Sequence, residues 1–166
     1  MDFTRVLRHL FTGPLAVRNA FPATALAAIE YAIAQSEFGH RGEIRFAVEA
    51  GLDMLPLVRA TSARERAIEV FSQLRVWDTE YNNGVLIYLL LADHDVEIVA
   101  DRGIDAKVGH EKWEAICREM ETHFSQGQFE KGVIAGIQAI GNHLQEHFPI
   151  EREGGENELP NRPVIL

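Results

Sequence analysis

The run VLIYLLL, residues 85–91, constrains the fold more than any other part of the sequence. A half-buried edge strand alternates apolar and polar residues, whereas an unbroken apolar run of this length predicts a central strand with both faces covered. The next residues, ADHD (92–95), predict a turn, and VEIVA (96–100) predicts a strand that returns antiparallel to the first. We therefore expect a hairpin at the centre of a sheet.

Five helices and one further strand are predicted around this hairpin. A capping-box pair, Ser62 and Glu65, marks the start of one helix. Alternating apolar and charged residues predict a strand over 42–50. Apolar residues at helical spacing predict helices near 3–11, 22–38, 62–76, 107–124 and 130–147. This order predicts an α/β fold: a three-layer α/β/α sandwich around a small mixed β-sheet, with an extra N-terminal helix.

The chain of 166 residues fits one domain with a short extension at each end. We expect a domain over 23–149, preceded by an N-terminal amphipathic helix and linker (1–22) and followed by a flexible polar tail (150–166) whose apolar end is able to dock. The N-terminal helix would carry its apolar residues on one side: Phe3, Val6, Leu7, Leu10 and Phe11. Such a helix either packs on its own domain, which we favour, or lies on a membrane surface.

Composition excludes several classes of protein. A net charge of −9 and a pI near 5.2 exclude a general nucleic-acid binder, because phosphate contacts need a basic surface. No apolar run reaches the roughly 18 residues of a membrane span. Arg5, Arg8 and His9 interrupt the N-terminal apolar run, which argues against a signal peptide. The single cysteine, Cys117, excludes an internal disulfide and fits a reducing compartment. We expect a cytoplasmic protein, with peripheral association to the inner membrane as the alternative to test.

Oxygen-bearing side chains lie before the first strand of the predicted hairpin and after its second strand. If Asp93 and His94 form a two-residue loop, Leu86 faces Asp101, and the polar residues before and after the hairpin meet. A parallel β-α-β unit would bring the start of the 42–50 strand to the same place. The candidate metal ligands at this end are Glu37, Glu43, Asp78, Asn83 and Asp101.

Hard oxygen ligands of this kind suit Ca²⁺ or Mg²⁺ as a cofactor. A helix start expected near 106–109, with Arg102 beside it, would attract an anion such as phosphate. Together these features predict metal-assisted hydrolysis of a phosphoester ligand, with Asp101 and Arg102 as the catalytic residues. Structural explanations exist as well: a positive φ at Gly103, capping of the next helix by Asp105, and a surface ion pair for Arg102.

Four stretches of the sequence together resemble the TPM domain family. An asparagine-glycine pair opens an apolar strand, NNGVLIYLLL; a second strand leads into a glycine-containing turn, VEIVADRGI; and a late Gly-x-(Phe/Tyr) motif follows, GQFEKGVIAGI. The opening GEIRF, preceded by Glu37, resembles the GEIR-type strand of bacterial stand-alone members. The resemblance covers roughly residues 23–148. Asn83, Gly84, Asp101 and Gly103 match the general pattern, and Glu37 and Glu43 match the GEIR branch.

This resemblance implies an α/β/α sandwich and, in some members, divalent-metal binding. Plant thylakoid relatives are linked to acid phosphatase activity and photosystem repair, whereas an animal branch modulates a receptor and is not an enzyme, so membership alone assigns no activity. Many members carry a signal peptide and a C-terminal membrane helix, neither of which we expect in this chain. Because bacterial members often accompany LemA-type membrane proteins, the alternative to a phosphatase is a non-catalytic interaction module with such a membrane-protein partner.

The sequence HLQEH (143–147) matches H-x-x-E-H, in which two histidines bind Zn²⁺ and a glutamate acts as the base. Zinc needs a third protein ligand, and only 19 residues follow His147. The two histidines also lie at the edge of an apolar helix face, where ordinary packing explains them. Zinc hydrolysis is therefore a third alternative.

Overall fold

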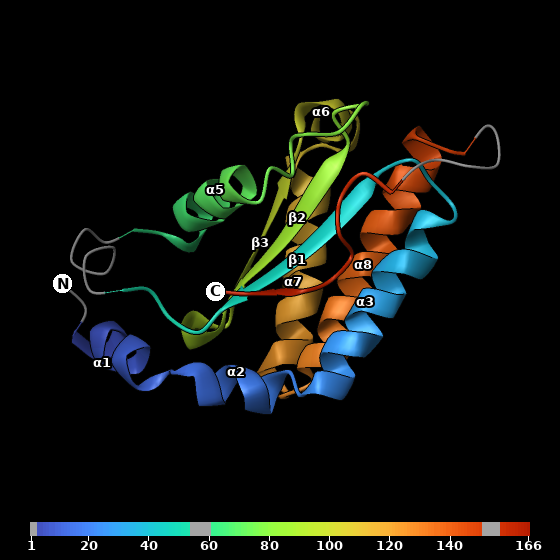
Figure 1. Ribbon diagram of the computed structural model, residues 1–166. Helices are drawn as coiled ribbons and strands as arrows, with labels where there is room; N and C mark the ends of the chain where they lie inside the picture. The colour runs from blue at the N-terminus through green and yellow to red at the C-terminus, as the bar shows by residue number, and fades with distance from the viewer. Residues whose placement is uncertain (1–2, 54–60, 151–156) are drawn as a thin grey trace.

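The computed structural model describes residues 3–53, 61–150 and 157–166, and Figure 1 shows helices around a four-stranded sheet. The strands are β1 (Glu43–Glu49), β2 (Gly84–Leu90), β3 (Asp95–Ala100) and β4 (Val164–Ile165). Their order in the sheet is β3-β2-β1-β4, with β1 parallel to β2 and β4, and β2 antiparallel to β3. The predicted parallel β-α-β unit and antiparallel hairpin are both present.

Helices cover both faces of the sheet (Figure 1). One face is covered by α3 (Ala23–Glu37), α7 (His110–Ser125) and α8 (Phe129–His147), and the other by α5 (Ala63–Gln73). At one end of the sheet are α1 (Phe3–Phe11) and α2 (Pro14–Ala20), and at the other is α6 (Arg102–Val108). The predicted three-layer sandwich around a mixed sheet is confirmed. Within the described residues, no helix has the length and hydropathy needed to cross a bilayer.

Strand β2 is buried along its whole length. Its odd-numbered apolar residues belong to the core cluster under α3, α7 and α8, and its even-numbered ones to the cluster under α5. Side chains alternate across a strand, so a strand covered on both faces requires an unbroken apolar run. The predicted central strand is confirmed as β2, although Leu91 belongs to the turn that follows it.

The turn of the hairpin is longer than predicted. Four residues connect the strands rather than two: η1 (Leu91–Asp93), a 3-10 turn, and His94, whose φ is 52°. Val85 consequently pairs with Ala100 rather than with Arg102, which moves the register by two residues. The open ends of the hairpin still meet.

Helices differ from the prediction at two places. The single helix predicted over 107–124 is two helices, because Gly109 adopts a φ of 86° and separates α6 from α7. The linker predicted before residue 22 contains α2, which starts at Pro14 and buries Val17 in the main core. The N-terminal extension therefore contributes to the core of the domain.

The C-terminal tail docks on the sheet through its apolar end, which is the alternative that the sequence left open beside a flexible tail. Val164 pairs with Ala47 in the parallel β4–β1 ladder, and the Leu166 N–H donates to Val48 O at 2.9 Å. The apolar end of the tail therefore docks as a fourth strand. Residues 151–156 of the predicted tail lie outside the described chain.

Candidate functional site

Three segments of the chain meet at the end of the sheet where Figure 1 shows α6 beside the start of β2. Gly84 pairs with Glu43, and its carbonyl accepts the backbone N–H of Asp101 at 2.8 Å. Asn83 Nδ2 donates to the backbone carbonyl of Arg41 at 3.1 Å. Residues before β1, before β2 and after β3 are thus in direct contact, as the sequence predicts.

Asn83 directly precedes β2 and Asp101 directly follows β3, and we call the two residues the hairpin corner. Asn83 is fully buried, and its N–H donates to Thr79 Oγ1 at 3.1 Å. Asp101 Oδ1 accepts the Arg102 N–H at 2.7 Å and caps α6. The other side-chain oxygens, Asn83 Oδ1 and Asp101 Oδ2, are buried without a hydrogen-bond partner among the described residues. Burying an acceptor without a hydrogen bond costs about 1–3 kcal/mol of folding free energy. Both oxygens are therefore suited to a cation or a hydrogen-bond donor that would remove this cost.

Two backbone carbonyls lie against Gly103 beside the hairpin corner. A Cβ on Gly103 would lie 2.5 Å from Asn82 O and 2.6 Å from Tyr81 O. Gly103 does not have the positive φ that we predicted. Glycine is required here because two carbonyl oxygens occupy the space that a side chain would need.

The helix that follows β3 begins earlier than predicted. It starts at Arg102 rather than near 106–109, because Asp101 acts as its N-cap. Asp105, which we predicted as the cap, instead accepts a hydrogen bond from Trp113 Nε1 at 2.9 Å and so joins α6 to α7. The Arg102 side chain is exposed at this helix start.

Glu37 and Glu43 line a neighbouring pocket of about 730 Å³. Glu37 Oε1 accepts the Ile44 N–H at 3.2 Å, and the Glu43 carboxylate accepts the N–H groups of Glu158 and Leu159 at 3.1 and 3.2 Å. Burial, and secondly the negative charge of Glu43, raises the pKa of Glu37 to about 8. Burial also raises the pKa of Glu43, while the two tail N–H groups act in the opposite direction. Both carboxyl groups are therefore already committed to backbone donors.

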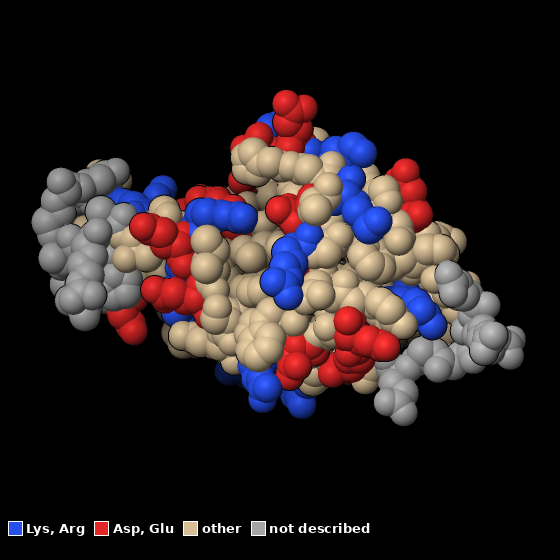
Figure 2. Space-filling model, turned by 90° about the horizontal axis from the view of Figure 1, so that it is seen from above, with Lys and Arg blue, Asp and Glu red and all other residues tan. Residues whose placement is uncertain are grey.

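Other walls of this pocket are residues that sequence reasoning missed. Arg41 donates to the Tyr81 hydroxyl at 3.0 Å and lies 4.9 Å from the centre of its ring. The Glu80 N–H donates to Glu158 Oε2 at 2.9 Å. Arg41 lies two residues before β1, so its position in the sequence could have placed it at this end of the sheet. Nothing in the sequence of the tail predicts that Glu158 lies beside Glu43. Figure 2 shows Lys and Arg interspersed with Asp and Glu across this end of the molecule.

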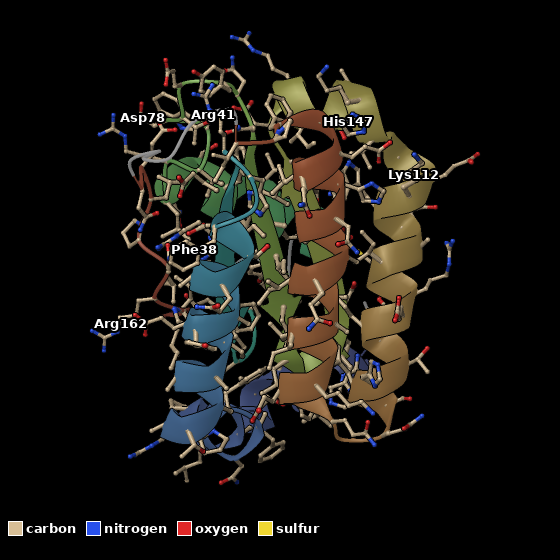
Figure 3. All side chains as sticks on the ribbon, turned by 90° about the vertical axis from the view of Figure 1, so that its right-hand side faces the viewer. Phe38, Arg41, Asp78, Lys112, His147 and Arg162 are labelled. Carbon is tan, nitrogen blue, oxygen red and sulfur yellow. The ribbon has the colours of Figure 1, made fainter. Side chains whose placement is uncertain are left out.

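Asp78 belongs to neither group. It is exposed and pairs with Arg75 at 3.0 Å, and Figure 3 shows it at the same end of the molecule as Arg41 but at the outer margin. Across the described parts of the chain, no three His, Cys, Asp or Glu side chains are arranged to hold a metal. The five predicted ligands therefore divide between the hairpin corner, the pocket and the surface residue Asp78, and within the pocket Glu43 binds the backbone of the tail.

The H-x-x-E-H residues lie near the end of α8. His143 and His147 are each close to Glu146, at 3.9 and 3.8 Å, and the His143 ring packs edge-on against Trp113 with centroids 5.8 Å apart. No further described His, Cys, Asp or Glu completes a metal group with them. Packing against Trp113 and a weak ion pair account for His143, whereas His147 Nε2 is buried without a hydrogen-bond partner among the described residues.

Comparison with known proteins identifies the family of this chain. No curated protein matches it. The NMR structure of the BA42 protein from the psychrophilic bacterium Bizionia argentinensis is 31% identical with a TM-score of 0.77, covering 88% of this chain and 95% of that chain. The solution NMR structure of the N-terminal domain of a protein from P. gingivalis shares the fold at 16% identity, with a TM-score of 0.61, covering 81% and 85% of the two chains. A family model described as the TPM domain matches residues 18–143. The chain therefore belongs to the TPM domain family.

Proposed function

We propose that this TPM domain binds a divalent cation at the hairpin corner, with Asn83 and Asp101 as its side-chain ligands. The observation that supports the proposal is the pair of buried side-chain oxygens that have no hydrogen-bond partner among the described residues. A carboxylate oxygen and an amide oxygen are hard ligands, as Ca²⁺ and Mg²⁺ require. The carbonyls of Tyr81 and Asn82, which lie against Gly103, are oxygens of the same kind.

A site with one carboxylate and one amide would bind the cation weakly. Ca²⁺ takes about six to eight oxygen ligands, and Mg²⁺ usually keeps several of its own waters, so water would complete either coordination sphere. We expect a dissociation constant of about 10⁻⁴–10⁻³ M, as in weak Ca²⁺ modules. Glu37 and Glu43 line the neighbouring pocket and accept backbone N–H groups there, so neither is proposed as a ligand of the cation.

A cation titration followed by NMR tests this proposal. We expect Ca²⁺ and Mg²⁺ to shift the backbone amide signals of residues 83–84 and 101–103. Asp101→Asn should weaken binding at least about tenfold, because it removes the only carboxylate charge of the corner. Asparagine is as good an N-cap as aspartate, so the variant should keep α6 and its thermal stability.

Asp78→Asn is the matched control, because it removes the same charge from an exposed carboxylate at the same end of the molecule. It should leave the cation affinity within about twofold of the original chain. Unmoved amides at 83–84 and 101–103, or an equal loss of affinity in both variants, would contradict a site at the hairpin corner.

Metal-dependent phosphoester hydrolysis is a more demanding proposal, with Arg102 contacting the phosphoryl oxygens. Its support is the exposed Arg102 beside the capped start of α6. The adjoining pocket weakens it, because the carboxylates of Glu80 and Glu158 line that pocket and would repel a phosphate dianion. The competing proposal, a non-catalytic module with a LemA-type membrane partner, rests on the family resemblance alone.

An assay with an aryl phosphate separates these proposals. Hydrolysis by Asp101 and Arg102 predicts turnover that requires added Mg²⁺ or Ca²⁺ and that falls at least about a hundredfold in both Asp101→Asn and Arg102→Ala. Asp78→Asn should keep full turnover. No turnover by a chain that binds the cation would favour the non-catalytic module. Turnover that survives both substitutions would point to contamination or to another site.

A further inference from the structure

The N-terminal helix α1 packs against the domain through its polar side. Arg5 Nε and His9 Nε2 lie 3.0 and 3.1 Å from Asp93 Oδ2, and Arg8 pairs with the other oxygen of the same carboxylate. His9 is buried, and its Nδ1 accepts the Leu52 N–H at 2.9 Å. Burial would raise the pKa of Asp93, but the Arg5 hydrogen bond and the His9 charge hold it below its usual value.

The apolar side of α1 faces solvent instead of the core. Leu7, Leu10 and Phe11 are 39%, 56% and 84% exposed, and Leu15 of α2 is 72% exposed; the side chain of Phe3 lies outside the described residues. Single exposed apolar residues are ordinary, whereas several on adjoining helices mark an interaction surface. We call these four exposed residues the apolar face. Helix α1 packs on its own domain, as we favoured, but it does so through its polar side, because Asp93 anchors that side.

The charges around the apolar face are positive, although the whole chain carries −9. Residues 3–20 include three arginines and a histidine but no Asp or Glu. Arg18 is exposed, and Arg8 stays 51% exposed while it pairs with Asp93. Arg8 and Arg18 therefore place positive charge beside the apolar face of an acidic protein.

We infer that α1 and α2 dock on the surface of a bilayer that contains anionic phospholipids. Leu7, Leu10, Phe11 and Leu15 would enter the boundary between headgroups and acyl chains. Arg8 and Arg18 would contact the lipid phosphates. Amphipathic helices bind such surfaces by this combination of buried apolar area and attraction to anionic lipids.

A second copy of the chain fits the apolar face less well than a bilayer does. Helices α1 and α2 have only nine and seven residues, and the apolar face consists of four side chains. This face is small for a stable protein interface, in which each partner buries about 800 Å². In a symmetric dimer the face would also meet its own copy, which would bring the arginines of the two chains together. A bilayer needs neither a large nor a shape-matched surface.

The docking surface and the hairpin corner lie at opposite ends of the sheet, as Figure 1 shows for α1 and α2 against α6. Docking through α1 and α2 would leave the hairpin corner and its pocket directed away from the membrane. This inference does not depend on cation binding. Asp101→Asn should therefore associate with vesicles as the original chain does.

Co-sedimentation with lipid vesicles tests the inference. We expect the full chain to sediment with vesicles of mixed phosphatidylglycerol and phosphatidylcholine, and at least about tenfold less with phosphatidylcholine alone. Salt at about 1 M, where the screening length falls to about 3 Å, should weaken the association. The double variant Leu10→Ser/Phe11→Ser should lose it at least about tenfold while keeping its thermal unfolding temperature, because both side chains are mostly exposed.

Tyr31→Ser/Phe38→Ser is the matched control, because these side chains are 65% and 77% exposed and lie elsewhere. Figure 3 shows Phe38 at the end of α3 that is far from α1 and α2. The control should sediment like the original chain. Equal losses in both double variants, or no sedimentation with anionic vesicles, would overturn the inference. So would self-association in solution that only Leu10→Ser/Phe11→Ser abolishes, because the face would then belong to a second copy.

Discussion

Gly84→Ala is expected to destabilise the fold by about 3 kcal/mol or more, the upper part of the range for overpacked sites. A Cβ at this position would overlap the carbonyl oxygen of Val76 and come within 3.1 Å of its Cγ1. The first obstacle is backbone, which cannot rotate away as the end of a flexible side chain can. Strand β2 and the segment before it would have to separate, and urea unfolding should show the loss as a lower midpoint with an unchanged slope.

Gly39→Ala provides the matched control for this substitution. A Cβ there would meet the Ser36 carbonyl at 3.5 Å and the Gln145 side chain at 3.6 Å, which are ordinary contacts. The added methyl also restricts the unfolded chain, so stability should stay level or rise by up to about 1 kcal/mol. Equal stability of the two variants would show that Val76 does not approach Gly84 as closely as described. Since Gly84 O accepts the Asp101 N–H, Gly84→Ala should also shift the NMR signals of the hairpin corner.

The elements that the sequence predicts best are those whose causes are local. The unbroken apolar run of β2 requires cover on both faces, and both faces are covered. The Ser62 and Glu65 capping box forms as predicted, with both of its hydrogen bonds present. The hairpin then joins Gly84 to Asp101 through a backbone hydrogen bond, even though its register was predicted two residues away. Local patterns therefore predicted the central strand, the start of α5 and the meeting of the outer ends of the hairpin.

What the sequence did not predict depends on contacts between distant segments. The tail docks because the N–H groups of Glu158 and Leu159 reach the Glu43 carboxylate more than 100 residues away, and no periodicity in a polar segment announces such a contact. The same contact explains why Glu43 turns away from the hairpin corner. Gly103 is a second example. Glycine is required there because two backbone carbonyls lie close to it, and the sequence alone does not distinguish this reason from a positive φ.

The orientation of α1 is the clearest case of one contact overriding a pattern. Its apolar stripe predicts inward packing, but a single carboxylate, Asp93, attracts Arg5, Arg8 and His9 from the opposite side. Periodicity identifies two sides of a helix without saying which one meets the domain. In this protein the side that meets the domain is determined by Asp93, which was predicted to lie in the hairpin loop and for which no partner was predicted.

Glu37→Gln is expected to stabilise the fold at alkaline pH and to change little near pH 4. Folded Glu37 keeps its proton up to about pH 8, because burial and the neighbouring Glu43 disfavour its charge, whereas the unfolded carboxyl group loses its proton near 4.5. Between these values the folded state binds more protons than the unfolded state, so stability falls as pH rises. The favourable contribution of Glu37 is complete below 4.5 and is lost by about pH 8. At about 1.4 kcal/mol per pKa unit, the upper limit of the loss is about 5 kcal/mol.

The measurement is the free energy of unfolding by urea at several pH values, taken as the difference between Glu37→Gln and the original chain. Taking this difference removes the contribution of His40, whose pKa burial lowers to about 4 and which therefore favours folding as pH rises toward 6.5. Glutamine keeps an oxygen for the Ile44 N–H, so the hydrogen bond at this position survives the substitution. The difference should grow steadily in favour of the variant from pH 5 to pH 8 and then level off.

Glu65→Gln is the control of opposite sign. Its hydrogen bonds from the backbone and side chain of Ser62 lower the pKa of Glu65, so its contribution favours folding above pH 4.5 and is lost as pH falls through the lowered pKa. Between pH 5 and pH 8 the Glu65→Gln difference should therefore stay constant and unfavourable, while the Glu37→Gln difference changes with pH. A Glu37→Gln difference that is equally flat would show that Glu37 is ionised in the folded protein at neutral pH. Glu37 would then carry a negative charge beside Glu43. In that case the pocket, rather than the hairpin corner, would be the better site for a cation.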